Sequence, residues 1–170
     1  MWVQRLIELT RWEPLGLSVG WESIESELQL PLPADYKELV EAFGGGTFCE
    51  SVFFLAQSDS PAFDFVTQWR ASLSASEADD PHPAYSPGRN GVIEWGATEW
   101  ADQYCWLVDA QHPGKYPILA RGDAGEWRKF EMSTSEFLYR VLTDSDFKPF
   151  GIVQYALEPE FQPGRSVGDM

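Results

Sequence analysis

Apolar residues recur at helical spacing through the first third of the chain. In residues 32–48, LPADYKELVEAFGGGTF, they fall at i, i+3, i+4 and i+7, and charged residues lie between them. This pattern predicts a helix with one buried face that ends at Gly44, since a glycine commonly supplies the left-handed residue that closes a helix. Two similar patterns, WVQRLIEL and GWESIESEL, predict shorter helices before it. The buried positions of the 32–48 helix are Tyr36, Leu39, Val40 and Phe43.

Three consecutive glycines follow this helix and lead into a short apolar run. The run, ESVFFLA, has the length and composition of a buried strand. We therefore expect residues 44–46 to turn the backbone from the helix into the first strand, at a place where side chains would obstruct packing.

A further helical pattern precedes a long polar segment. Ala62, Val66, Trp69 and Leu73 would share one helical face, which predicts a helix with these residues buried. Residues 74–91 then combine three prolines with acidic residues and show no period, so they predict a loop. It is long for a compact domain, which indicates a mobile or functional segment.

The second half of the chain changes to short runs with strand character. VIEWGAT, QYCWLVD, KYPILAR and EWRKFEM are separated by turn-rich connectors, which predicts an antiparallel meander. STSEFLYRVLT carries a capping box, Ser133 three residues before Glu136, and predicts a helix after the sheet. The order of these predicted helices and strands along the chain predicts a single α+β domain over residues 1–150, with N-terminal helices packed on a mainly antiparallel central sheet. In residues 151–170 we expect an edge strand in GIVQYALE and a loose tail.

The charge of the chain narrows the classes of ligand. Its 170 residues include 27 acids and 12 bases, a formal net charge of -15 at pH 7. Such a surface repels phosphate, so we expect no direct binding of nucleic acid and no anionic membrane partner. The acids form either a solvated shell or a field that attracts a basic protein. No apolar run reaches the roughly 20 residues of a membrane span and no signal peptide is recognisable, which predicts a cytoplasmic protein.

Residues able to carry chemistry are few. Cys49 and Cys105 are far apart in sequence and fit free thiols in a reducing compartment, with a single disulfide as the alternative. His82 and His112 each lie beside proline in a predicted loop. None of the short paired spacings typical of zinc sites is present, so we expect no metal and no cofactor.

One pair of carboxylates supports an enzymatic alternative. Glu94 and Glu99 flank WGAT, and paired carboxylates hydrolyse glycosides. With 27 acids such pairs arise by chance, and the simpler interpretation is a hairpin whose polar residues face water. We therefore predict no catalytic residue. The alternative is an enzyme, such as a hydrolase using Glu94 and Glu99, that acts through one of these carboxylates or a histidine, and a deep pocket holding one of them with a strongly shifted pKa would favour it.

The order of several modest motifs resembles the SUKH superfamily, which includes a yeast cell-wall assembly regulator and many bacterial immunity proteins. The motifs are the helix in WESIESEL, the LPADYKEL helix ending in glycines, IEWGATEW before an aromatic strand, and the STSEFL helix, and together they span about residues 21–142. Two features depart from the family. Many members have asparagine where Gly44 stands, a change we expect to be conservative because both residues tolerate a left-handed backbone. Members also have a compact segment in place of residues 74–91.

The resemblance implies a non-enzymatic binding protein that neutralises a toxin in the cell that makes it. Many nuclease toxins are basic, and an acidic partner with aromatic anchors would associate with them quickly. A scaffold or regulator with endogenous partners is the alternative for the same fold. For Trp95 and Trp100, core packing and partner contact are equally favoured, whereas Trp106 and Trp127 are predicted in the core. The residues predicted to contact the partner are Glu94, Trp95, Glu99, Trp100, Asp102 and Tyr104.

Overall fold

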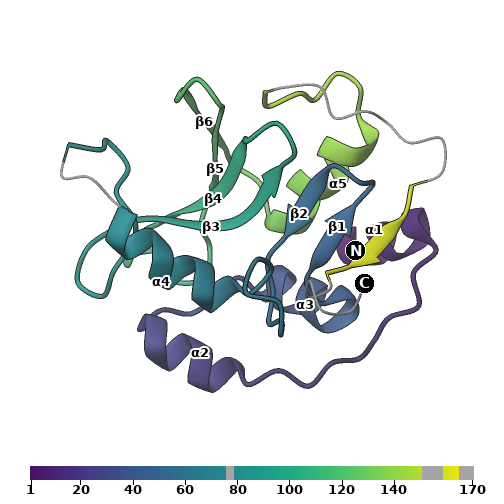
Figure 1. Cartoon of the computed structure of the whole chain (residues 1–170), viewed down its shortest axis with the longest axis horizontal. Coiled ribbons are helices and arrows are strands. Elements are labelled where there is room, and N and C mark those ends of the chain that lie inside the picture. Colours follow the sequence, from purple (N-terminus) through teal and green to yellow (C-terminus); the bar gives the residue numbers. More distant parts are fainter. Residues whose placement is uncertain (76–78, 151–158, 165–170) are drawn as a thin grey trace.

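The protein folds around one antiparallel sheet of seven strands in the order β6-β5-β4-β3-β2-β1-β7. A computed structural model describes residues 1–75, 79–150 and 159–164 (Figure 1). The strands from β3 to β6 form the predicted meander, so that prediction is confirmed. The strands are β1 (Gly46–Phe48), β2 (Val52–Phe54), β3 (Gly91–Thr98), β4 (Gln103–Val108), β5 (Ile118–Arg121), β6 (Trp127–Phe130) and β7 (Phe161–Pro163).

Three of the helices pack together and build the main core with the sheet. Helices α1 (Trp2–Thr10), α3 (Ala34–Phe43) and α5 (Thr134–Thr143) contact one another. We call the face of β3–β5 that carries Ile93, Trp106 and Ile118 the core face, because their side chains are fully buried there. Tyr36 of α3 meets Trp106 at 4.8 Å between ring centroids. The α+β fold with a helix after the sheet is therefore as predicted.

Two further helices lie elsewhere along the sheet. Helix α2 (Trp21–Leu28) is joined to α4 (Phe65–Ala75) by an ion pair between Glu27 and Arg70. Helix α4 contacts β3 and is drawn in front of it in Figure 1. Ser72 and Ala75 of its last turn line a cavity on the opposite side of the sheet. We call this side, which carries Glu94, Gln103 and Arg121, the outer face.

The three glycines do what the sequence predicts, and the structure adds a strand there. Gly44 closes α3 with φ +69° and ψ −170°, and Gly46 already belongs to β1. A Cβ on Gly46 would lie 2.3 Å from the carbonyl oxygen of Gln162 in β7, so only glycine allows the two strands to pair. The conformation of Gly44 is reserved almost entirely for glycine. The expectation that asparagine is a conservative replacement there is wrong, because asparagine tolerates a different, left-handed region.

The C-terminal tail corrects a second expectation. Phe161–Pro163, predicted to be loose, pairs with β1 as strand β7, and Phe161 is buried. The segment GIVQYALE, where an edge strand was predicted, lies outside the described residues. The tail is held because Phe161 packs on aromatic rings of the first helices and strands, contacts that no local pattern reveals.

Helix α4 begins later than its apolar pattern indicates. The Asp64 carboxylate accepts a hydrogen bond from the Thr67 N–H at 3.0 Å, which fixes the start of the helix after Ala62. The buried residues are then Phe65 and Trp69, and Leu73 is exposed. The predicted stripe is therefore wrong apart from Trp69 and the half-buried Val66.

The described part of the predicted loop is anchored to the protein. Tyr85 is buried, and its hydroxyl donates to the carbonyl oxygen of Leu28 at 2.8 Å. The indole of Trp69 donates to the Tyr85 carbonyl oxygen at 3.0 Å. These bonds hold Tyr85 against α2 and α4. At α5 the capping prediction holds, since the Ser133 hydroxyl accepts from the Glu136 N–H at 3.2 Å.

Candidate functional site

Three tight turns lie at the same end of the strands. In an antiparallel sheet the turns after β1, β3 and β5 must point the same way, and Figure 1 shows them along one border of the sheet. The residue before β7 reaches the same border, because Phe161 pairs with Phe48. We call the exposed carboxylates here the acidic rim: Glu50, Glu99, Asp123, Glu126 and Glu160.

Hydrogen bonds join neighbouring turns of the acidic rim. The Glu99 N–H donates to the Ser51 carbonyl oxygen at 3.1 Å, and the Ser51 hydroxyl lies 3.3 Å from the Glu99 carboxylate. The Cys49 N–H donates to the Glu160 carbonyl oxygen at 2.8 Å. Asp102 accepts from the backbone of Asp123. The backbones of these turns are thus held together, which lowers the conformational entropy that a partner must remove from the turns on binding.

The structure separates the six residues predicted to contact a partner. Trp95 and Tyr104 are 0% and 2% exposed, with their rings 5.7 Å apart in the core. For Trp95 the core-packing alternative is therefore the observed one. Asp102 is also buried, and burial is the main cause that raises its pKa. A buried side chain has no surface to offer a partner, so only Glu99 and the half-buried Trp100 remain candidates at the turn.

Glu94 lies apart from these residues, on the outer face. It pairs with Cys105 of β4, and Gln103 and Arg121 project from the same face. With Asp80 and His82 of the loop they line a cavity of about 130 Å³. Burial raises the pKa of Glu94 to about 7.

Glu94 and Glu99 do not form a catalytic pair. They are five positions apart along an extended segment, roughly 15 Å, whereas paired carboxylates of glycosidases lie about 5–9.5 Å apart. Glu99 does not line the cavity that holds Glu94. The structure thus contains the kind of pocket that would favour an enzyme, with Glu94, Asp80 and His82 in its lining, but the predicted second carboxylate, Glu99, lies outside it.

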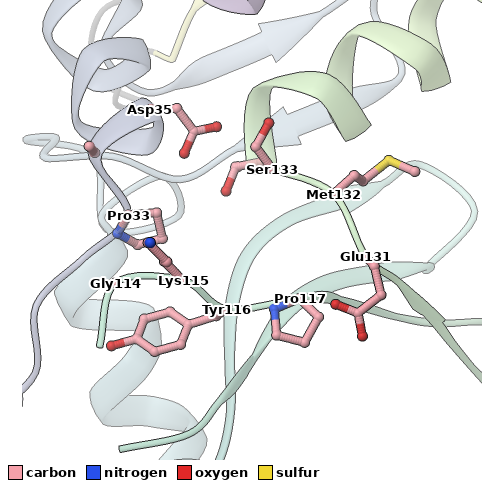
Figure 2. A pocket seen from close by; sticks show the side chains of 11 residues that line it. Pro33, Asp35, Gly114, Lys115, Tyr116, Pro117, Glu131, Met132 and Ser133 are labelled. Atoms are coloured by element: carbon pink, nitrogen blue, oxygen red, sulfur yellow. The ribbon is translucent and has the colours of Figure 1, made fainter. Parts of the chain in front are cut away.

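A cavity of about 480 Å³ lies where α3 and α5 begin (Figure 2). Asp35 faces the start of α5 and accepts from the N–H and the hydroxyl of Ser135, both at 2.7 Å. The Thr134 hydroxyl accepts from the Trp106 indole at 2.8 Å, and the Tyr116 hydroxyl donates to the Pro31 carbonyl oxygen at 2.8 Å. Because these polar groups already have partners, the cavity is a junction between elements rather than a reactive centre.

Most of the acidic rim is missing from the sequence-based prediction. Glu50, Asp123, Glu126 and Glu160 come from turns that are distant in sequence from Glu99. The signal that could have found them is the direction of the hairpins, since alternate turns of a meander share one end. That signal required recognising β1, which the sequence analysis missed, because its predicted first strand, ESVFFLA, contains β2 alone.

Comparison with known proteins places this fold in a family. A model of the family SUKH_6, described as SMI1-KNR4 cell-wall, matches residues 20–138. The chain belongs to the SUKH superfamily. Neither the curated proteins nor the solved structures include a match. The match covers the chain from the residue before α2 to the middle of α5, so it includes four of the five residues of the acidic rim.

Membership in the SUKH superfamily is consistent with a non-enzymatic protein of the immunity type. Within the described ranges, no three His, Cys, Asp or Glu side chains gather in an arrangement suited to a metal. None of the helices in those ranges has the length and apolar character to span a membrane. Cys49 and Cys105 are buried free thiols, as the sequence predicts.

Proposed function

We propose that this chain is an immunity protein that acts in the cytoplasm and neutralises a basic protein toxin by binding it directly. The acidic rim is the observation that carries the proposal: five exposed carboxylates gather along one end of the sheet in a chain of net charge -15. Family membership supports a protein partner.

The rim suits a basic partner for a physical reason. Carboxylates that share one surface add their fields, which attract a positively charged protein and speed its association. Trp100, half-buried between Glu99 and the buried Asp102, supplies an aromatic ring at the same place. Aromatic rings bordered by charge are typical of residues that dominate the binding energy of an interface.

Coexpression tests the proposal. The toxin gene adjacent to the gene for this chain is expressed with and without it, and we expect this chain to restore growth and to copurify with the toxin. Absence of both rescue and complex would contradict the immunity role and favour a scaffold or regulator with endogenous partners.

Charge reversal tests the place of binding. A triple variant of the rim, Glu50→Lys, Glu99→Lys and Glu126→Lys, should slow association with the toxin by about tenfold or more at low salt. The matched control reverses three exposed acids of the helices, Glu8, Glu22 and Glu38, and changes the net charge equally. Equal effects of the two triples would show that net charge alone steers binding. The association rate of the wild type should also fall as salt rises, because ions screen exposed charges over about 10 Å at 0.1 M.

A further inference from the structure

The outer face of the sheet carries charged side chains where a helix and a loop partly cover it. Glu94 of β3 pairs with Cys105 of β4, whereas Gln103 of β4 pairs with Arg121 of β5, which pairs with Trp127 of β6. Gln103 and Cys105 lie two residues apart on β4, so all of these side chains share the outer face. Trp127, which the sequence predicts in the core, is half-buried here instead. A cavity on this face is lined on its other side by α4 and the loop, through Ser72, Ala75, Asp80 and His82. A charged sheet face under a covering layer is costly unless the charges are paired.

Two ionisable side chains of this cavity, Glu94 and Arg121, have no ionic partner among the described residues. Among the described residues, none forms a hydrogen bond or ion pair with the Glu94 carboxylate, and no carboxylate lies within 4 Å of the Arg121 guanidinium. The Arg121 guanidinium lies over the ring of Trp127, 5.4 Å from its centroid. Glu94 stands level with Leu119 of β5, two residues from Arg121, so two strand spacings and two residues separate the backbones of Glu94 and Arg121 by roughly 12 Å. The opposite charges face the same space without touching.

The size and the remaining lining of the cavity restrict which ligands it can hold. The cavity volume of about 130 Å³ is many times the ~10–15 Å³ that one ordered water requires, yet below the ~300 Å³ at which sites for drug-sized molecules begin. His82 and Trp127 form an aromatic wall, with ring centroids 5.0 Å apart. The amide of Gln103 adds a donor and an acceptor.

We propose that this cavity binds a small zwitterion, with Glu94 receiving the ammonium group and Arg121 the carboxylate of one ligand. An ammonium alone would leave the Arg121 charge uncompensated beside it, and a carboxylate alone would leave Glu94 without a partner. A zwitterion pairs both charges and fits the size of the cavity. This site requires no toxin partner, so it stands or falls independently of the immunity role.

The state of Glu94 sets the pH dependence of binding. Burial raises the pKa of Glu94 to about 7, so near neutral pH much of the free protein carries the neutral acid. An ammonium group stabilises the carboxylate and lowers that pKa, so binding releases a proton. Affinity therefore rises from pH 6 to pH 8. The other titratable or charged groups facing the site are Asp80 and His82 of the loop, Cys105 of β4 and Arg121 of β5.

The experiment titrates the purified full chain with small probes and follows the indole N–H signal of Trp127 by NMR. Glycine, β-alanine and γ-aminobutyrate carry both charges at increasing separation, whereas n-propylamine and propionate carry one each. We expect at least one zwitterion to bind saturably and at least about tenfold more tightly than either single-charge probe. Its affinity should rise with pH in the wild type and in His82→Gln, which removes the imidazole.

Variants assign the two charges. Glu94→Gln and Arg121→Gln should each weaken the zwitterion by about tenfold, and only Glu94→Gln should abolish the pH dependence. Glu22→Gln, an exposed acid of α2, is the matched control and should bind as the wild type does. Thermal melts establish that each variant is folded, and the single-charge probes decide the assignment without any variant. Equal binding of propylamine and the best zwitterion would overturn the proposal in favour of a simple cation site, and absence of saturable binding by every probe would overturn the site itself.

Discussion

Replacing Phe161 with alanine tests whether the C-terminal strand is an integral part of the fold. The Phe161 ring is 6% exposed and lies 4.9, 5.0 and 4.7 Å from the rings of Trp12, Phe43 and Phe48. Truncation of a buried phenylalanine costs about 3–5 kcal/mol, because the transfer energy is lost and a cavity is left. We expect a loss of about 3–4 kcal/mol, a large part of the roughly 5–15 kcal/mol of a typical domain.

Urea denaturation followed by tryptophan fluorescence measures this loss. Gln162→Ala is the matched control on the same strand, since its exposed side chain bonds only the exposed carboxylate of Glu160, and it should change stability by no more than about 0.5 kcal/mol. A loss below about 1 kcal/mol for Phe161→Ala, or equal losses for both variants, would refute the docking of β7 on the aromatic cluster.

Three other substitutions test the local interpretations. Gly44→Ala and Gly44→Asn should both cost about 1–3 kcal/mol in a denaturation assay, because the strain lies in the backbone, and good tolerance of asparagine alone would show a left-handed residue instead. Ser133→Ala should destabilise the protein by about 0.5–2 kcal/mol through loss of the cap on α5, and a neutral effect would remove that role. Burial raises the pKa of Glu94 from 4.5 to about 7, so between these pH values the folded state binds a proton that the unfolded state releases. The resulting contribution to the free energy of unfolding is present at pH 4.5 and is lost as pH rises through 7. Relative to the wild type, Glu94→Gln should therefore gain up to about 3 kcal/mol between these pH values, and parallel pH profiles of the two proteins would contradict the shift.

The spacing of apolar residues along the sequence was sufficient to predict the helices and strands that bury one face. Helix α3, the β3–β6 meander and helix α5 each display their inner residues at the spacing of the element itself. The glycines at residues 44–46 were equally readable, because a backbone that must approach another strand excludes side chains wherever that strand comes from. These features depend on neighbours in sequence.

Features formed between distant segments were not readable in this way. Trp95 and Trp100 have similar local surroundings in the sequence, yet Trp95 packs against Phe137 of α5 and Trp100 stays half-buried at a turn. Phe161 lies in a polar tail and is recognisable as a core residue only once Phe43 and Phe48 are in place.

The sequence by itself determined the fold class, the family and the negative charge of this protein, because period, motif order and composition are properties of the chain. Only the tertiary structure decided where that charge acts. Pairing of the strands brings three turns together as the acidic rim, and the same pairing places Glu94 and Arg121 on one face of the sheet, in the lining of one cavity beside α4. Such placements depend on strand order and on which face is covered, and both are set by contacts between segments far apart in the chain.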